Sequence, residues 1–223
     1  LNLKRTKIGV KGVEHLKDAL KCVNNNLTEL YLAYNDIGDE GAKYLSDSLK
    51  CENCKLILLN LRENYLGDKG VEHLGNALKD VKCKLSALNL RRNIIGAKGA
   101  EVLSDALKDK NCYLTMLNLG DNNVGDKGAE LLRNSLKDAQ CELTVLDLAQ
   151  NKIGDIGAKH LSNAIKDGNC KLTQLHLSQN NIGEKGVEYL SNALKCENCK
   201  LTVLSLSWSR VGDQEIGRAS CRE

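Results

Sequence analysis

A fixed period of 29 residues restricts the fold of this chain more than any other feature. The leucine before each strand-like stretch recurs without insertion at Leu27, Leu56, Leu85, Leu114, Leu143, Leu172 and Leu201. Self-similarity at such a period indicates stacked units rather than one globular core. We therefore expect a repeat domain over 1–213, with part of a repeat at 1–26, complete repeats at 27–55, 56–84, 85–113, 114–142, 143–171 and 172–200, and an incomplete repeat from 201.

One unit, 143–171, predicts a strand, a loop and a helix. Leu146 and Leu148 alternate with polar or outward positions, which is typical of a short strand. Ala158, Leu161 and Ile165 follow at helical spacing and form one apolar stripe. Crossover helices return the chain in the same direction, so the strands should be parallel and the connections right-handed. Thin strands and wide helices cannot stack straight, so the strands should lie on a concave face and the helices on a convex face.

Several polar and small residues recur once per repeat and are interpreted as fold positions. Asp155 is expected to cap its own helix, and Gly168 to end that helix in the left-handed conformation. An asparagine series should satisfy backbone groups where the strand turns into the loop, and a glycine series should allow close packing at the helix start. These series are Asn35, Asn64, Asn93, Asn122, Asn151 and Asn180, and Gly41, Gly70, Gly99, Gly128, Gly157 and Gly186.

The composition excludes several classes of protein. The chain has neither Pro nor Phe and only 3% aromatic residues, so its core must be built from aliphatic side chains in thin layers. A net charge of +3 is too small to predict a specific nucleic acid or an anionic membrane as the partner. No apolar run approaches the roughly 20 residues of a membrane span.

The written-out unit resembles the ribonuclease-inhibitor-like class of leucine-rich repeats, and most of all the repeat region of NOD-like receptors. The segments that carry the resemblance are NDIGDEGAKYLSDSL at 35–49 and ALKCENCKLTVLSL at 193–206. It implies an α/β leucine-rich-repeat horseshoe in a cytoplasmic protein of innate immunity. Its role would be ligand recognition or autoinhibition, without catalysis and without a cofactor. No G-x-x-x-x-G-K-[ST] phosphate loop is present in the sequence.

Two alternative regulatory functions use similar repeats. Ribonuclease inhibitors tend to be acidic and rich in tryptophan, whereas this chain is slightly basic and has one Trp. A GTPase-activating regulator would be expected to carry an acidic C-terminal region and a complete N-terminal cap, and neither is evident. Among the possible functions, catalysis is the least favoured, because the sequence places no nucleophile beside a histidine.

The ten cysteines suggest a structural role. Six occupy one repeat position, which predicts a ladder of buried, reduced thiols and an intracellular setting: Cys54, Cys83, Cys112, Cys141, Cys170 and Cys199. The two C-E-N-C segments, at 51–54 and 196–199, lie five repeats apart and cannot share a metal ion. Each offers two thiols and no nearby histidine, so neither metal nor redox chemistry is favoured.

Positions that change from repeat to repeat are free to serve recognition. They are the outward strand residues and the two residues after the last strand leucine. From them we select ten candidate binding residues: Tyr31, Tyr34, Arg62, Arg91, Arg92, Met116, Asp121, Asp147, His176 and Trp208. The arginines, with Lys4 and Arg5, should make the N-terminal half of the concave face basic. We expect this face to bind an acidic protein or peptide, and the alternative is an ordinary solvated surface.

The C-terminal segment 214–223 departs from the repeat. Glu215, Ala219 and Glu223 stand where the pattern requires Gly, Leu and Leu. The segment is therefore predicted to be a non-repeat tail that packs poorly.

Overall fold

The computed structural model describes residues 1–209, in which helices and three-residue strands alternate. The strands are β1 Glu29–Tyr31, β2 Leu58–Asn60, β3 Ala87–Asn89, β4 Met116–Asn118, β5 Val145–Asp147, β6 Gln174–His176 and β7 Val203–Ser205. The helices are α1 Gly9–Lys21, α2 Gly38–Leu49, α3 Asp68–Leu78, α4 Ala97–Leu107, α5 Gly125–Leu136, α6 Asp155–Ile165 and α7 Glu184–Leu194. The predicted tail, 214–223, lies outside the described residues.

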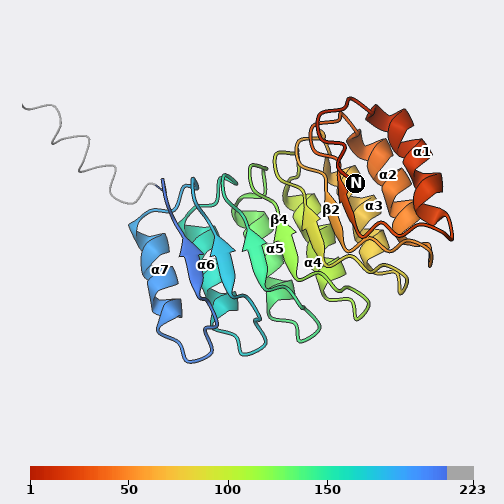
Figure 1. The fold of residues 1–223 in the computed structure, drawn as a ribbon. Helices are drawn as coiled ribbons and strands as arrows, with labels where there is room; N and C mark the ends of the chain where they lie inside the picture. Colours follow the sequence, from red (N-terminus) through yellow and green to blue (C-terminus); the bar gives the residue numbers. More distant parts are fainter. Residues whose placement is uncertain (210–223) are drawn as a thin grey trace, which may run out of the picture.

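The strands form one parallel sheet in sequence order, from β1 to β7. Each strand pairs with the next at a register of 29 residues, as in Leu30 with Leu59 and Leu59 with Leu88. Figure 1 shows the strands along one face of the array and the helices along the other. The expected fold class, an α/β leucine-rich-repeat solenoid with a strand-lined concave face, is confirmed.

The core is a continuous column of aliphatic side chains between the sheet and the helices. Within one layer, Leu59 and Leu61 from the strand side and Leu74 from α3 are fully buried. Burying a leucine stabilises the fold by roughly 1.5–3 kcal/mol, and each layer depends on its neighbours to cover it. The few aromatic residues are therefore not needed for the core.

The asparagine series forms a hydrogen-bonded ladder through the loops. Asn64 Oδ1 accepts from the backbone N–H groups of Asn35 at 3.0 Å and Ile37 at 3.4 Å, both in the preceding repeat. Its Nδ2 donates to the carbonyls of Leu32 at 2.8 Å and Arg62 at 3.2 Å. One buried side chain thus satisfies backbone donors and acceptors of two repeats, which confirms the structural interpretation of the series.

Replacing Asn64 by Ala should destabilise the protein by on the order of 3 kcal/mol, because several buried backbone groups lose their partners at once. Urea unfolding followed by circular dichroism measures the change. Asn123→Ala is the matched control, since Asn123 is exposed and accepts only from Lys152 Nζ in the described structure. Equal losses from the two variants would contradict the ladder's role.

A second bond between repeats corrects the prediction for Asp155. Asp155 is the first residue of α6, and its carboxylate does not cap that helix. Its Oδ1 instead accepts from the N–H groups of Gly183 at 2.7 Å and Gly186 at 2.9 Å in the next repeat. Asp39, Asp68 and Asp126 make the same pair of bonds to the repeats that follow them. The aspartate acts as an N-cap one repeat away, since Asp155 stands after the N-cap position of its own helix, which Gly154 occupies.

Where this aspartate is missing, the next helix starts differently. Val10 and Ala97 occupy the position, and the glycines one repeat later, Gly38 and Gly125, adopt φ values of +59° and +60°. Helices α2 and α5 consequently begin at those glycines, one residue earlier than α3, α4, α6 and α7. The left-handed conformation there favours glycine.

Asp68→Ala should lower the free energy of unfolding by about 1 kcal/mol, because the N–H groups of Gly96 and Gly99 at the start of α4 lose their acceptor. The converse variant, Ala97→Asp, should raise it by less than about 1 kcal/mol, because the N–H groups of Gly125 and Gly128 already donate to the carbonyls of Asn151 and Val124. Chemical denaturation gives both values. Asp105→Ala serves as the control, since Asp105 pairs only with Lys108 on the surface of the same helix. A neutral Asp68→Ala would refute the cross-repeat cap.

The two expectations for glycine have opposite outcomes. A Cβ at Gly157 would lie 2.6 Å from Ile153 Cγ2, so the close-packing role is confirmed there. Gly168 is not among the residues with positive φ, so its predicted left-handed role is wrong. Asp167 closes this turn instead, accepting from the N–H of Asn169 through its side chain and from Cys170 through its carbonyl.

Candidate functional site

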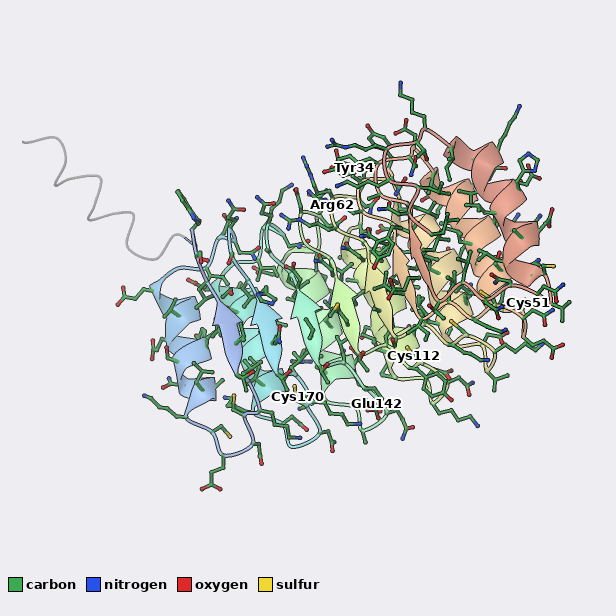
Figure 2. All side chains as sticks on the ribbon, in the orientation of Figure 1. Tyr34, Cys51, Arg62, Cys112, Glu142 and Cys170 are labelled. Atoms are coloured by element: carbon green, nitrogen blue, oxygen red, sulfur yellow. The ribbon has the colours of Figure 1, made fainter. Side chains whose placement is uncertain are left out.

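The concave face carries a cationic cluster at its N-terminal end. The ring of Tyr34 has Arg5 Cζ at 4.5 Å, Arg62 Cζ at 5.5 Å and Lys4 Nζ at 5.6 Å from its centroid. Tyr34 itself has a φ of +62°, where the chain leaves the strand and turns into the loop. Figure 2 shows Tyr34 and Arg62 close together at this edge of the sheet. Cation–π attraction holds the positive groups near one another.

Arg62 and Arg91 occupy equivalent positions in neighbouring repeats and have unused hydrogen-bonding capacity. The Nε atom of each is buried and has no acceptor among the described residues. Their neighbours in the same row are small, with Ala33 before Arg62 and Gly120 after Arg91. Neither guanidinium forms a salt bridge within the described part of the chain. Both side chains are partly exposed, so their charge, though not the buried Nε atom, is available to an external anion.

Arg92 differs from the other two arginines, because its charge is used within the chain. Its Nη1 lies 3.0 Å from Glu63 Oε2, and its Nε lies 3.1 Å from Asp121 Oδ2. The contact to Glu63 is an ion pair whose angles do not meet hydrogen-bond geometry, which is why that oxygen lacks a directional bond. Arg92 and Asp121 thus belong to an acid–base–acid bridge, and Arg92 adds little to the basic surface.

A pocket of about 290 Å³ lies against this bridge. Its walls are Glu63, Tyr65, Arg92, Asn93, Ile94 and Asp121. Tyr65 is 64% exposed and Ile94 is 58% exposed, so the pocket has an uncovered apolar wall. The sequence analysis did not select Tyr65 and Ile94. In other repeats their position holds polar residues, namely Asp36, Asn123 and Lys152. Two large apolar side chains at a position that is otherwise polar could have indicated a binding surface.

The other candidate residues do not join this cluster: Tyr31 lies on β1, in the same repeat as Tyr34, and the rest lie further along the same face. Tyr31 donates to Glu29 Oε2 at 2.9 Å, and this hydrogen bond raises the pKa of the Tyr31 phenol. Asp147 accepts from Asn118 Nδ2, and His176 Nδ1 lies 3.2 Å from Ser205 Oγ. Met116 is 46% exposed and Trp208 is 86% exposed. The ten predicted residues thus share one surface but divide into separate groups.

The cysteine ladder lies at the opposite edge of the sheet, where Figure 2 shows Cys112 and Cys170. Every cysteine within residues 1–209 is a free thiol. Five of the six ladder cysteines are buried, and Cys199 is partly exposed. Burial raises the pKa of Cys83, Cys112 and Cys141 to about 11. These thiols are structural and unreactive near neutral pH.

The raised thiol pKa values predict a loss of stability in alkali. Below about pH 9 the thiols are protonated in both states; between pH 9 and about 11 only the unfolded chain ionises, which favours unfolding. Each such thiol then costs at most about 1.4 kcal/mol per pH unit. Cys112→Ala should reduce the slope of unfolding free energy against pH in this range, while Cys22→Ala, at an exposed cysteine of another repeat position, should not. An unchanged slope for Cys112→Ala would exclude the effect.

The fold and this surface define a repeat protein whose variable residues lie on one strand-lined face. The family model described as Leucine Rich repeat matches residues 23–46, 52–75, 81–104, 110–132, 140–162, 168–191 and 197–214. The chain therefore belongs to the leucine-rich-repeat proteins, whose repeats serve as protein-binding scaffolds, and the match indicates no catalytic family. A search of curated proteins gave no match.

Solved structures with similar folds support the architecture alone. Internalin C2 from Listeria monocytogenes is 22% identical with a TM-score of 0.55, over 93% of this chain and 80% of that one. A plant ice-binding protein is 19% identical with a TM-score of 0.54, over 91% of this chain and 54% of that one. Between residues 1 and 209, none of the helices has the length and apolar character needed to cross a bilayer.

Proposed function

We propose that this domain binds an acidic protein or peptide through the N-terminal half of its concave face. The observation that carries the proposal is the group of unpaired cations there. Arg62 and Arg91 have no carboxylate partner in the described structure, whereas Arg92 is bridged by two. Arginine forms strong, directional bonds to carboxylates and, with tyrosine, is common among the residues that dominate interface energies.

Charge reversal tests this proposal. The variants Arg62→Glu and Arg91→Glu should each weaken binding of a fluorescent hexaglutamate peptide on the order of tenfold or more, because a charge-assisted bond becomes a repulsion. Fluorescence anisotropy at fixed ionic strength gives the dissociation constants. Arg133→Glu on α5 is the matched control, because it makes the same charge change on a helix away from the strand face. Unchanged affinity in both concave variants would overturn the proposal.

We further propose that the domain is the sensing or regulatory arm of a cytoplasmic NOD-like-receptor-type protein. The 29-residue unit and its N-C-K-L-T junction support this assignment, and so do the free thiols of the ladder, which suit a reducing compartment. Sequencing the parent gene tests it: a nucleotide-binding domain encoded upstream is the expected result, and a secretion signal directly before the repeats would contradict it.

A further inference from the structure

Three cations converge on one ring without internal neutralisation. Arg5, Arg62 and Lys4 each lie within 5.6 Å of the Tyr34 centroid. Like charges held this close repel one another, and cation–π contacts at an exposed site offset only about 0.5–1 kcal/mol each. The cluster is therefore stabilised further by any anion that enters it.

The acidic side chains near the cluster have other partners. Glu29 accepts the hydroxyl of Tyr31 at 2.9 Å, and Glu63 lies 3.0 Å from Arg92. No salt bridge within residues 1–209 joins an acid to Lys4, Arg5 or Arg62. The positive charge at this end of the face is thus concentrated on three side chains around one ring.

The row beside the cluster adds two arginines without a carboxylate partner, and their Nε atoms are buried. The Nε of Arg62 and of Arg91 lacks an acceptor. Asn60 Oδ1 accepts from the N–H of Arg62 at 3.0 Å, and its amide NH₂ has no hydrogen-bond partner among the described residues. The equivalent amide NH₂ of Asn118 is already bound to Asp147. Unpaired cations and the amide of Asn60 therefore lie at the ends of β2 and β3, next to the cluster.

We propose that this cluster is a binding site for a phosphate monoester carried by a peptide partner. A phosphate monoester has a charge of about −1.5 to −2 and three acceptor oxygens on one atom, which suits several donors and cations that converge on one place. A single carboxylate supplies one negative charge and would leave the cluster unbalanced. Arginine clusters are a general means of recognising phosphorylated side chains. This inference rests on the proposed function and specifies the anion within it.

The direct test compares three short peptides on the full chain. They are acetyl-Ala-phosphoserine-Ala-amide and the same peptide with glutamate or with serine. Arginine Nε–H signals in ¹⁵N-correlated NMR spectra report binding residue by residue. The phosphopeptide should shift the Arg62 signal in a saturable way and bind at least about tenfold tighter than the glutamate peptide. The Arg92 signal should move least, because its partners are Glu63 and Asp121.

Variants separate the parts of the site. Arg62→Gln should weaken phosphopeptide binding about tenfold or more, and Arg133→Gln should leave it unchanged. Tyr34→Phe keeps the aromatic ring and should bind within about twofold of the parent, whereas Tyr34→Ala removes the ring that positions the cations and should bind several-fold more weakly. Thermal unfolding of each variant establishes that a loss of binding is not a loss of fold.

The outcomes distinguish this inference from the proposed function. Equal affinity for the phosphoserine and glutamate peptides, or saturation without a shift at Arg62, would overturn the phosphate site while hexaglutamate binding still supports an acidic partner. Tighter binding of a thymidine hexamer, which carries only phosphodiesters, would also overturn it and indicate a nucleic acid. Failure of all acidic probes, hexaglutamate included, would reject both proposals.

Discussion

The asparagine ladder is the interaction on which the rest of the structure depends. Each loop turns the chain from strand to helix and leaves backbone donors and acceptors in a buried place, where an unpaired group is costly. Asn64, Asn93 and their equivalents satisfy these groups in their own repeat and in the one before it. The first turn after each strand is thereby held in a common form, with positive φ at equivalent residues such as Tyr34, Glu63 and Arg92, and this form sets the direction of the side chains there.

The aspartate caps add a second tie between repeats, and here the repeats are not equivalent. Asp39, Asp68, Asp126 and Asp155 fix the helix starts that follow them, whereas Val10 and Ala97 leave theirs to a left-handed glycine. The junction from α4 to α5 therefore lacks the two side-chain hydrogen bonds that the aspartate provides at its neighbours. Because stability in such arrays is set between neighbours, a single residue type at one repeat position determines the local strength of the stack.

The concave face combines a regular scaffold with irregular charge. Within the scaffold, polar groups are satisfied by the ladder and the caps. On the surface, Arg92 is neutralised by Glu63 and Asp121. Arg62 and Arg91, which occupy the preceding position of the repeat, have no carboxylate partner in the described structure. The difference between a structural arginine and an available one comes from the side chains of adjacent repeats. Recognition can therefore change by substitution without disturbing the stack.

The sequence by itself determined the fold, because a 29-residue period leaves each unit unable to bury its apolar face except against a copy of itself. It also assigned the asparagines, close-packing glycines and ladder cysteines to structure, since residues repeated in every layer fill equivalent places. Only the tertiary structure decided which helix Asp155 caps, that Arg92 is bridged, and that Tyr65 and Ile94 wall a pocket. Those contacts join residues about 29 positions apart, and each depends on the direction that a side chain takes. The period of the sequence gives the repeat position of each residue, but it does not give the partner that the side chain contacts.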